Sequence, residues 1–241
     1  MNKEILLPGL AEQYRLLVGN TDLKNKRVLV MGTGSEEVAK RISVKSGNEV
    51  DLIIEDYESL MNTKLILKDT KGINLKIMNF EHTDFSNNTF DVVYAQASIN
   101  NKRRNNILKE IKRILKNEGF LCVGEIINLK KKVPRFVEMI YDISNQEPLF
   151  DSELTRFYVE RDFECIFEKD FSDTLKVYYK QIIEKLSAIK QGLSEKEKTK
   201  SKKLLVQIAH ESKSYLQQGA NKFIGYKVLL LKRRKIDNKN V

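Results

Sequence analysis

The sequence is poor in the residues that define several protein classes. It has 2 cysteines, 3 prolines and 11 glycines in 241 residues, which excludes a disulfide scaffold, a CxxC zinc site and a proline- and glycine-rich disordered chain. No stretch approaches the roughly 18 apolar residues of a membrane span, and the first residues lack the pattern of a secretory signal. With 41% hydrophobic residues, the chain is expected to fold as a cytoplasmic protein with a real core, without metal and without membrane association.

The net charge of +10 is unevenly distributed. Residues 1–128 hold 19 basic and 17 acidic side chains, a net of +2, whereas residues 129–241 hold 24 and 16, a net of +8. Two runs, at 196–203 and 232–239, carry much of the excess. A basic surface can bind nucleic acid, but charged runs more often form solvated helix faces. Nucleic acid is therefore a possible partner and not the favoured one.

Short apolar runs alternate with helical patterns through the first half of the chain. Strands are expected at 27–31, 50–54, 75–78, 90–95 and 120–123, and helices at 8–18, 36–43, 58–67 and 106–115. This alternation predicts a parallel sheet with helices on both faces. In such sheets, ligands bind at the carboxyl ends of the strands.

The second half changes character. A helix at 152–160 and a strand at 163–167 precede a strongly amphipathic helix at 174–191. A capping box at Ser194–Glu197 predicts a further helix, and a last strand is expected at 223–231. Cys122 and Cys165 fall on different strands and are expected to be core thiols rather than a disulfide.

Polar or flexible residues end three of the predicted strands. Gly32-Thr-Gly34 forms a turn that a ligand can approach closely, because glycine lacks a Cβ. Glu55 follows the second strand, where an acid can accept hydrogen bonds from both hydroxyls of a ribose. Asn79 follows the third and can pair with an adenine edge. Each also has a purely structural explanation. The glycine turn can serve to pack a helix on a strand, Glu55 can stabilise the dipole of the following helix, and Asn79 can form a turn.

Four motifs in order resemble class I S-adenosylmethionine-dependent methyltransferases, specifically the small-molecule branch called type 11. The glycine motif of that family, VLDIGCGTG, is similar to VLVMGTGSE at 28–36. The acid loop is similar to 54–61, and the segment ending in FDVV to 79–93. The most specific match is LKEIKRILKNEG at 108–119. The resemblance covers residues 28–124.

The resemblance implies an α/β fold: a Rossmann-like, seven-stranded, mostly parallel sheet with an antiparallel last strand and helices on both faces. It implies one domain, in which residues 1–128 bind the cofactor and residues 129–241 bind the substrate. A helical cap at about 173–221 would be inserted before the last strand. The function implied is in-line transfer of a methyl group from S-adenosyl-L-methionine to a small molecule, with catalysis mostly by proximity.

The resemblance also assigns cofactor contacts by position. Gly32 and Gly34 would face the methionine part, Glu55 the ribose, Asp56 and Tyr57 the adenosine, and Asn79 and Phe80 the adenine. Ala95 and Gln96 would lie near the sulfonium and the acceptor. The full cofactor set is Met31, Gly32, Thr33, Gly34, Glu55, Asp56, Tyr57, Asn79, Phe80, Ala95 and Gln96. In the cap, Tyr178 and Tyr179 are candidate substrate residues, with packing of the helix as the alternative.

Two departures from the family keep other functions open. The usual acid of the glycine motif is Val30, and its third glycine is Glu36. These changes leave open the hypothesis of a non-catalytic protein that binds a ligand or partner. The basic second half leaves open the hypothesis of an RNA-modifying methyltransferase. A Rossmann dehydrogenase would need a glycine at Glu37. No base is evident, because His82 and His210 are more simply solvated side chains.

Overall fold

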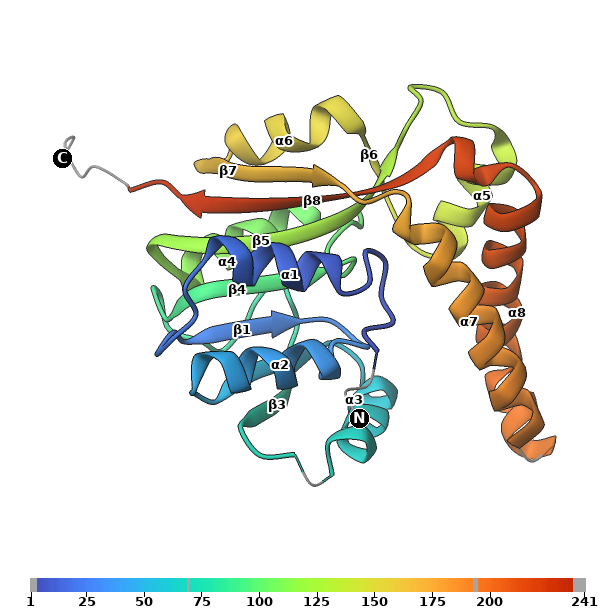
Figure 1. Ribbon diagram of the computed structural model, residues 1–241, viewed down its shortest axis with the longest axis horizontal. Helices are drawn as coiled ribbons and strands as arrows, with labels where there is room; N and C mark the ends of the chain where they lie inside the picture. The colour runs from blue at the N-terminus through green and yellow to red at the C-terminus, as the bar shows by residue number, and fades with distance from the viewer. Residues whose placement is uncertain (1–3, 69, 193–194, 236–241) are drawn as a thin grey trace.

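The computed structural model describes residues 4–68, 70–192 and 195–235. Helices and strands alternate through the first half, as expected, and the second half adds a long helical hairpin (Figure 1). The elements in chain order are α1 Glu12–Asn20, β1 Val28–Met31, α2 Glu36–Ser46, β2 Val50–Ile54, α3 Tyr57–Leu67, β3 Ile73–Ile77, β4 Phe90–Gln96, α4 Arg104–Ile114, β5 Leu115–Asn128, α5 Arg135–Ile143, β6 Leu149–Phe150, α6 Asp151–Val159, β7 Phe163–Asp170, α7 Thr174–Gly192, α8 Glu195–Gln217, a 3₁₀ turn Ala220–Lys222 and β8 Ile224–Arg233.

One sheet organises the molecule. Its strand order is β3-β2-β1-β4-β5-β8-β7, and the two-residue β6 pairs with β5 outside this path. Neighbouring strands are parallel from β3 to β5, whereas β8 runs antiparallel to both β5 and β7. This arrangement confirms the predicted fold class. Because β8 separates β5 from β7, it also keeps Cys122 apart from Cys165, and both thiols are free.

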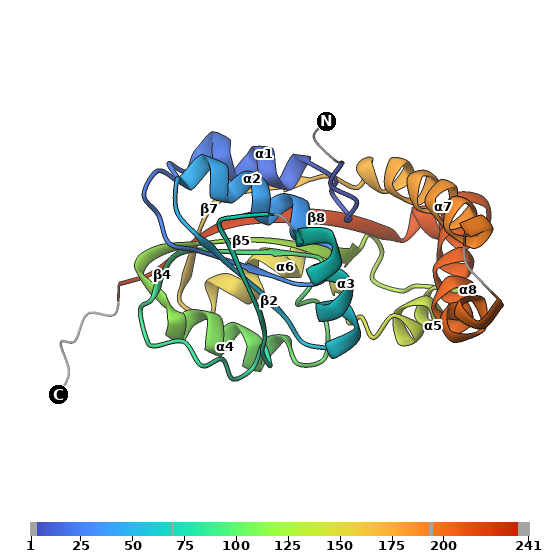
Figure 2. The same cartoon turned by 90° about the horizontal axis from the view of Figure 1, so that it is seen from below.

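The core has two layers, one on each face of the sheet. Figure 2 shows α1 and α2 over one face and α4 and α6 over the other. Side chains alternate along a strand, so Val28 and Val30 of β1 join the layer under α1 and α2, and Leu29 and Met31 join the other. All four are fully buried, and burial of each such side chain contributes about 1.5–3 kcal/mol.

The amino-terminal helix starts later than its apolar pattern suggests. It begins at Glu12 rather than near Pro8, because Gly9 and Leu10 have positive φ angles of 83° and 47°, which an α-helix does not allow. Gln13 of α1 is fully buried. Its amide nitrogen donates to the carbonyl of Ala95 at 3.0 Å, and its amide oxygen accepts from the Tyr226 hydroxyl at 2.6 Å. These bonds hold the amino-terminal segment against β4 and β8.

The insertion between β7 and β8 is a helical hairpin made of α7 and α8. It stands beyond the carboxyl end of β1 (Figures 1 and 2). The rings of Tyr179 on α7 and Tyr215 on α8 pack at 4.5 Å between centroids, which joins the two helices near the sheet. Ser194 of the predicted capping box lies outside the described residues, and α8 follows directly at Glu195. Within the described ranges, no helix combines the length and apolar character needed to cross a membrane.

Candidate active site

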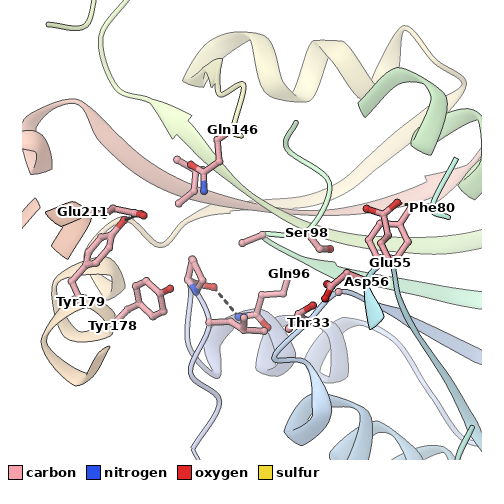
Figure 3. A pocket seen from close by; sticks show the side chains of 15 residues that line it. Thr33, Glu55, Asp56, Phe80, Gln96, Ser98, Gln146, Tyr178, Tyr179 and Glu211 are labelled. Atoms are coloured by element: carbon pink, nitrogen blue, oxygen red, sulfur yellow. Dashed lines mark hydrogen bonds between the residues drawn. The ribbon is translucent and has the colours of Figure 1, made fainter. Parts of the chain in front are cut away.

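A cavity of about 350 Å³ opens at the carboxyl ends of β1, β2 and β4. It runs from the strand ends to the cap, so the two ends are formed by different parts of the chain (Figure 3). Its lining residues are Leu7, Pro8, Gly32, Thr33, Glu55, Asp56, Phe80, Gln96, Ala97, Ser98, Ile126, Gln146, Tyr178, Tyr179 and Glu211. The volume is within the range of small-molecule sites.

The glycine turn after β1 has the backbone geometry that requires glycine. Gly32 and Gly34 have φ angles of 115° and 83°, which are strained for any residue with a Cβ. A Cβ on Gly32 would also lie 2.6 Å from the Cβ of Ser98. The hydroxyls of Ser35 and Ser98 are buried and have no hydrogen-bond partner within the described ranges. Of the two, Ser98 lines the cavity, and its unsatisfied hydroxyl beside a bare backbone surface suits a polar ligand.

Glu55 is held by its neighbours on two sides. Its Oε1 accepts from the backbone N–H of Phe80 at 3.0 Å, which draws the loop after β3 toward the end of β2. The guanidinium of Arg103 binds both carboxylate oxygens, with Nη1–Oε1 at 2.9 Å and Nη2–Oε2 at 2.5 Å. Arg103 also approaches Glu81 at 3.4 Å. The hydrogen bond to Glu55 is the main reason that the pKa of Arg103 is raised.

The Arg103–Glu55 pair was not expected from the sequence. Arg103 directly precedes α4, 48 residues after Glu55, and no local pattern connects the two. It also lines a second hollow of about 420 Å³ together with Glu55, Ile77, Met78 and Asn79. A ribose that used Glu55 would therefore have to share or displace a bidentate arginine.

Most of the other residues expected near adenosine surround these two hollows. Asp56 caps α3 by accepting from the backbone N–H of Ser59 at 2.8 Å, and it lines the cavity. Phe80 is buried and also lines it. Asn79 is exposed and lies two residues beyond the end of β3. Tyr57 is 69% exposed and lines neither hollow.

The end of β4 is used mainly for structure. Gln96 is 2% exposed, and its amide nitrogen donates to the carbonyls of Pro8 and Leu10 at 2.8 and 2.9 Å. It thus lines the cavity while fixing the amino-terminal segment as one wall. Ala95 and Met31 lie in the hydrophobic core and do not line the cavity. Any contact of a ligand with these two residues would have to be through the backbone.

Neither of the two departures from the family motif lines the cavity. Val30 is fully buried in the layer under α1 and α2. Glu36 starts α2, is 8% exposed, and accepts from the Thr63 hydroxyl of α3 at 2.6 Å. Its negative charge also suits a helix amino terminus. Glu36 is therefore explained by the packing of α2 on α3, and it leaves the glycine turn open.

The cap end of the cavity combines aromatic rings with one carboxylate. The Tyr179 hydroxyl donates to Oε1 of Glu211 at 2.7 Å, and the Ser144 hydroxyl donates to Oε2 at 3.1 Å. Burial raises the pKa of Glu211, although these two hydrogen bonds oppose the shift. Burial, reinforced by the Glu211 charge, also raises the pKa of Tyr178 and that of Tyr179. In Figure 3 the Tyr178 hydroxyl points toward the interior of the cavity.

Sequence reasoning did not find Glu211, Gln146 or Ser98. Glu211 lies on α8, which the sequence predicted from its apolar residues only. Gln146 follows α5, a helix that was not predicted, and Ser98 lies in the turn after β4. The two histidines considered as bases, His82 and His210, are exposed and line neither hollow. Burial raises the pKa of the Cys122 thiol to about 12, so this thiol is inert at neutral pH.

The fold is the Rossmann-like fold of solved methyltransferase structures. Residues 29–123 match the family model described as a methyltransferase domain of type 11. This match and the solved structures with the same fold confirm the resemblance to class I S-adenosylmethionine-dependent methyltransferases. A search of curated protein sequences found no match.

Three solved structures illustrate the range of proteins with this fold. The [4+2]-cyclase SpnF superposes with a TM-score of 0.75 at 17% identity, covering 92% of this chain and 80% of its own. Phosphoethanolamine N-methyltransferase 2 of Haemonchus contortus gives 0.72 at 14%, covering 93% and 53%. Geranyl diphosphate C-methyltransferase of Streptomyces coelicolor A3(2), in complex with Mg²⁺, geranyl diphosphate and S-adenosyl-L-homocysteine, gives 0.67 at 12%, covering 92% and 77%. At these identities the likeness establishes the fold and not the substrate.

Proposed function

We propose that the protein is an S-adenosyl-L-methionine-dependent methyltransferase that acts on a small molecule. The observation that carries the proposal is one cavity with two unlike ends. The glycine turn, Glu55, Asp56 and Phe80 form one end, and the cap residues Tyr178, Tyr179 and Glu211 form the other. A transferase for two small molecules needs two adjoining sites of this kind.

The residues present fit the cofactor. The turn at Gly32 would receive the methionine part, and Ser98 offers a buried hydroxyl without a partner in the described part of the chain. Glu55 would accept from the ribose and Phe80 would cover the adenine. The bound cofactor would supply an electrophilic methyl group on a cationic sulfur. The chain's own task would be to orient the acceptor and to exclude water.

Titration calorimetry with S-adenosyl-L-methionine and S-adenosyl-L-homocysteine tests the cofactor assignment. We expect saturable binding of both, and Glu55→Gln should weaken it about tenfold, because a hydrogen bond to a charged group contributes about 1.5–3 kcal/mol. Asp22→Asn, on an exposed turn, is the matched control. No heat of binding at millimolar ligand would refute the assignment. Transfer of a labelled methyl group to a component of a cell extract would then establish catalysis.

The second candidate is a non-catalytic ligand- or partner-binding protein. The Arg103–Glu55 pair favours it, because the acid expected to receive the ribose already has a charged partner. The two candidates differ in one measurement: any enzymatic methyl transfer removes the second. The RNA-modifying candidate gains no support from the cavity, since no Lys, Arg or His is among the described residues that line it.

A further inference from the structure

The cap end of the cavity has chemistry that the cofactor does not account for. Tyr178 and Tyr179 on α7 approach with ring centroids 5.0 Å apart and planes at 62°. Glu211 on α8 lies beside them, and Gln146 comes from the turn after α5 (Figure 3). Two aromatic rings, a carboxylate and an amide thus face one space from three separate segments.

The lining is also strongly one-sided in charge. Three carboxylates line the cavity, Glu55, Asp56 and Glu211, and no basic side chain is among the described residues lining it. The three differ in their partners. Arg103 binds Glu55 from outside the cavity, and Asp56 accepts from the start of α3. Within the described ranges, Glu211 accepts hydrogen bonds only from the hydroxyls of Tyr179 and Ser144, and neither bond neutralises its charge. Burial raises the pKa of this carboxyl, and the neighbouring His210 opposes that shift because it favours the charged form.

We propose that the cap end is a binding subsite for a small cationic amine, with Glu211 as the counter-ion and Tyr178 as an aromatic wall. A carboxylate oxygen can accept more than one hydrogen bond, so both oxygens of Glu211 can serve a ligand while keeping their present donors. An aromatic face attracts an ammonium group by its quadrupole, most strongly where water is excluded. The inference rests on the proposed function only in making the amine the methyl acceptor. Methyl transfer to its nitrogen would first require the ammonium group to release a proton, which the carboxylate of Glu211 could accept, so that the nitrogen lone pair is free to attack.

Other ligand classes suit this end poorly. A phosphate or carboxylate group at this end would meet the carboxylate of Glu211 without a basic residue among the described lining residues, and like charges repel strongly where water is scarce. A purely apolar ligand would remove water from Glu211 and give nothing in return. A cationic amine is the class that satisfies the carboxylate and the rings together.

Choline and its neutral isostere 3,3-dimethyl-1-butanol provide a direct test, because they share shape and differ in charge. Binding is measured by titration calorimetry on the full chain without cofactor. We expect choline to bind about tenfold more tightly than the alcohol, and Glu211→Gln and Tyr178→Ala to weaken choline about tenfold. Asp56→Asn is the matched control: it removes the same charge at the other end, and asparagine still caps a helix. Asp56→Asn should change choline affinity less than about twofold, because only a screened long-range attraction connects this charge with a ligand at the cap end.

The outcomes separate this inference from the proposed function. Equal affinity for choline and the alcohol, or equal losses in Glu211→Gln and Asp56→Asn, would overturn the amine subsite. Thermal unfolding of each variant shows whether it is folded, and Tyr178→Leu, which removes the ring but keeps an apolar side chain, replaces Tyr178→Ala if that variant is not folded. Choline binding that depends on Glu211, with no binding of S-adenosyl-L-homocysteine, would refute the cofactor assignment alone. Cofactor binding without preference for choline would refute the amine subsite alone.

Discussion

The two ends of the cavity are built in different ways. The strand end uses residues that directly follow β1 and β2, so a few short motifs position the glycine turn, Glu55 and Asp56. The cap end gathers Gln146, Tyr178 and Glu211 from segments spread over 66 residues, positions 146 to 211. The two carboxylates also differ: a guanidinium binds Glu55, whereas in the described part of the chain Glu211 accepts hydrogen bonds from hydroxyls only. One end has its charge already paired and the other has charge to offer a ligand.

The glycine turn provides the largest expected effect. Gly32→Ala puts a Cβ at a φ of 115° and 2.6 Å from the Cβ of Ser98, and a strained backbone costs about 1–3 kcal/mol. We expect S-adenosyl-L-homocysteine affinity to fall by up to about 100-fold, while choline affinity stays within about twofold. Calorimetry with both ligands measures the two ends separately.

Gly19→Ala is the control for that substitution. Gly19 lies in α1, and no atom lies within 4 Å of an added Cβ. This variant should bind both ligands normally and gain up to about 1 kcal/mol in the free energy of unfolding. Unaltered cofactor affinity in Gly32→Ala would show that the turn does not contact the cofactor.

Substitution of Arg103 gives the next largest effect. Whether the affinity for S-adenosyl-L-homocysteine rises or falls shows whether Arg103 competes with the cofactor or helps to bind it. If the arginine competes with the ribose for Glu55, Arg103→Met should strengthen S-adenosyl-L-homocysteine binding about fivefold, since a partly exposed ion pair is worth up to about 1 kcal/mol. The pair is 38% and 26% exposed. Lys102→Met removes the same charge from the neighbouring exposed residue. Weaker binding in Arg103→Met alone would instead make Arg103 part of the cofactor site.

The sequence predicted the sheet and the strand end well because both depend on local patterns. Apolar runs and turn residues set β1 to β4, and Gly32, Glu55 and Phe80 line the cavity near the ends of these strands. Their contact with a cofactor stays a prediction. The side-chain partners could not be predicted, because Arg103 reaches Glu55 across 48 residues. The sequence predicts α8 from the spacing of its apolar residues, and this pattern does not indicate that the polar Glu211 lines a cavity. The late start of α1 depends on two left-handed residues, which its periodicity does not reveal.

The pH dependence of stability should differ between the wild type and Glu211→Gln. The folded pKa of Glu211 is raised by burial, so folding disfavours its ionised form. Its stabilising contribution is therefore greatest below the unfolded value of about 4.3 and declines as pH rises through the folded pKa. The free energy of unfolding of the wild type, relative to Glu211→Gln, should fall by about 1.4 kcal/mol for each unit by which the pKa is raised. Urea titrations at pH 4.5 and pH 7.5 measure the difference, and a constant difference would show that the carboxylate is solvated.

The two neighbouring tyrosines offer the finest comparison. Tyr179 donates to Glu211, so Tyr179→Phe leaves a buried oxygen of that carboxylate with one donor fewer and should cost about 1 kcal/mol in stability. Tyr178→Phe keeps the aromatic face and removes a hydroxyl that points into the cavity (Figure 3). Because the attraction of an ammonium group comes from the ring, choline affinity should then change less than about twofold. A large loss in Tyr178→Phe, measured by calorimetry, would mean that the hydroxyl rather than the ring contacts the ligand, and the subsite would have to select a hydrogen-bonding group instead of a charge.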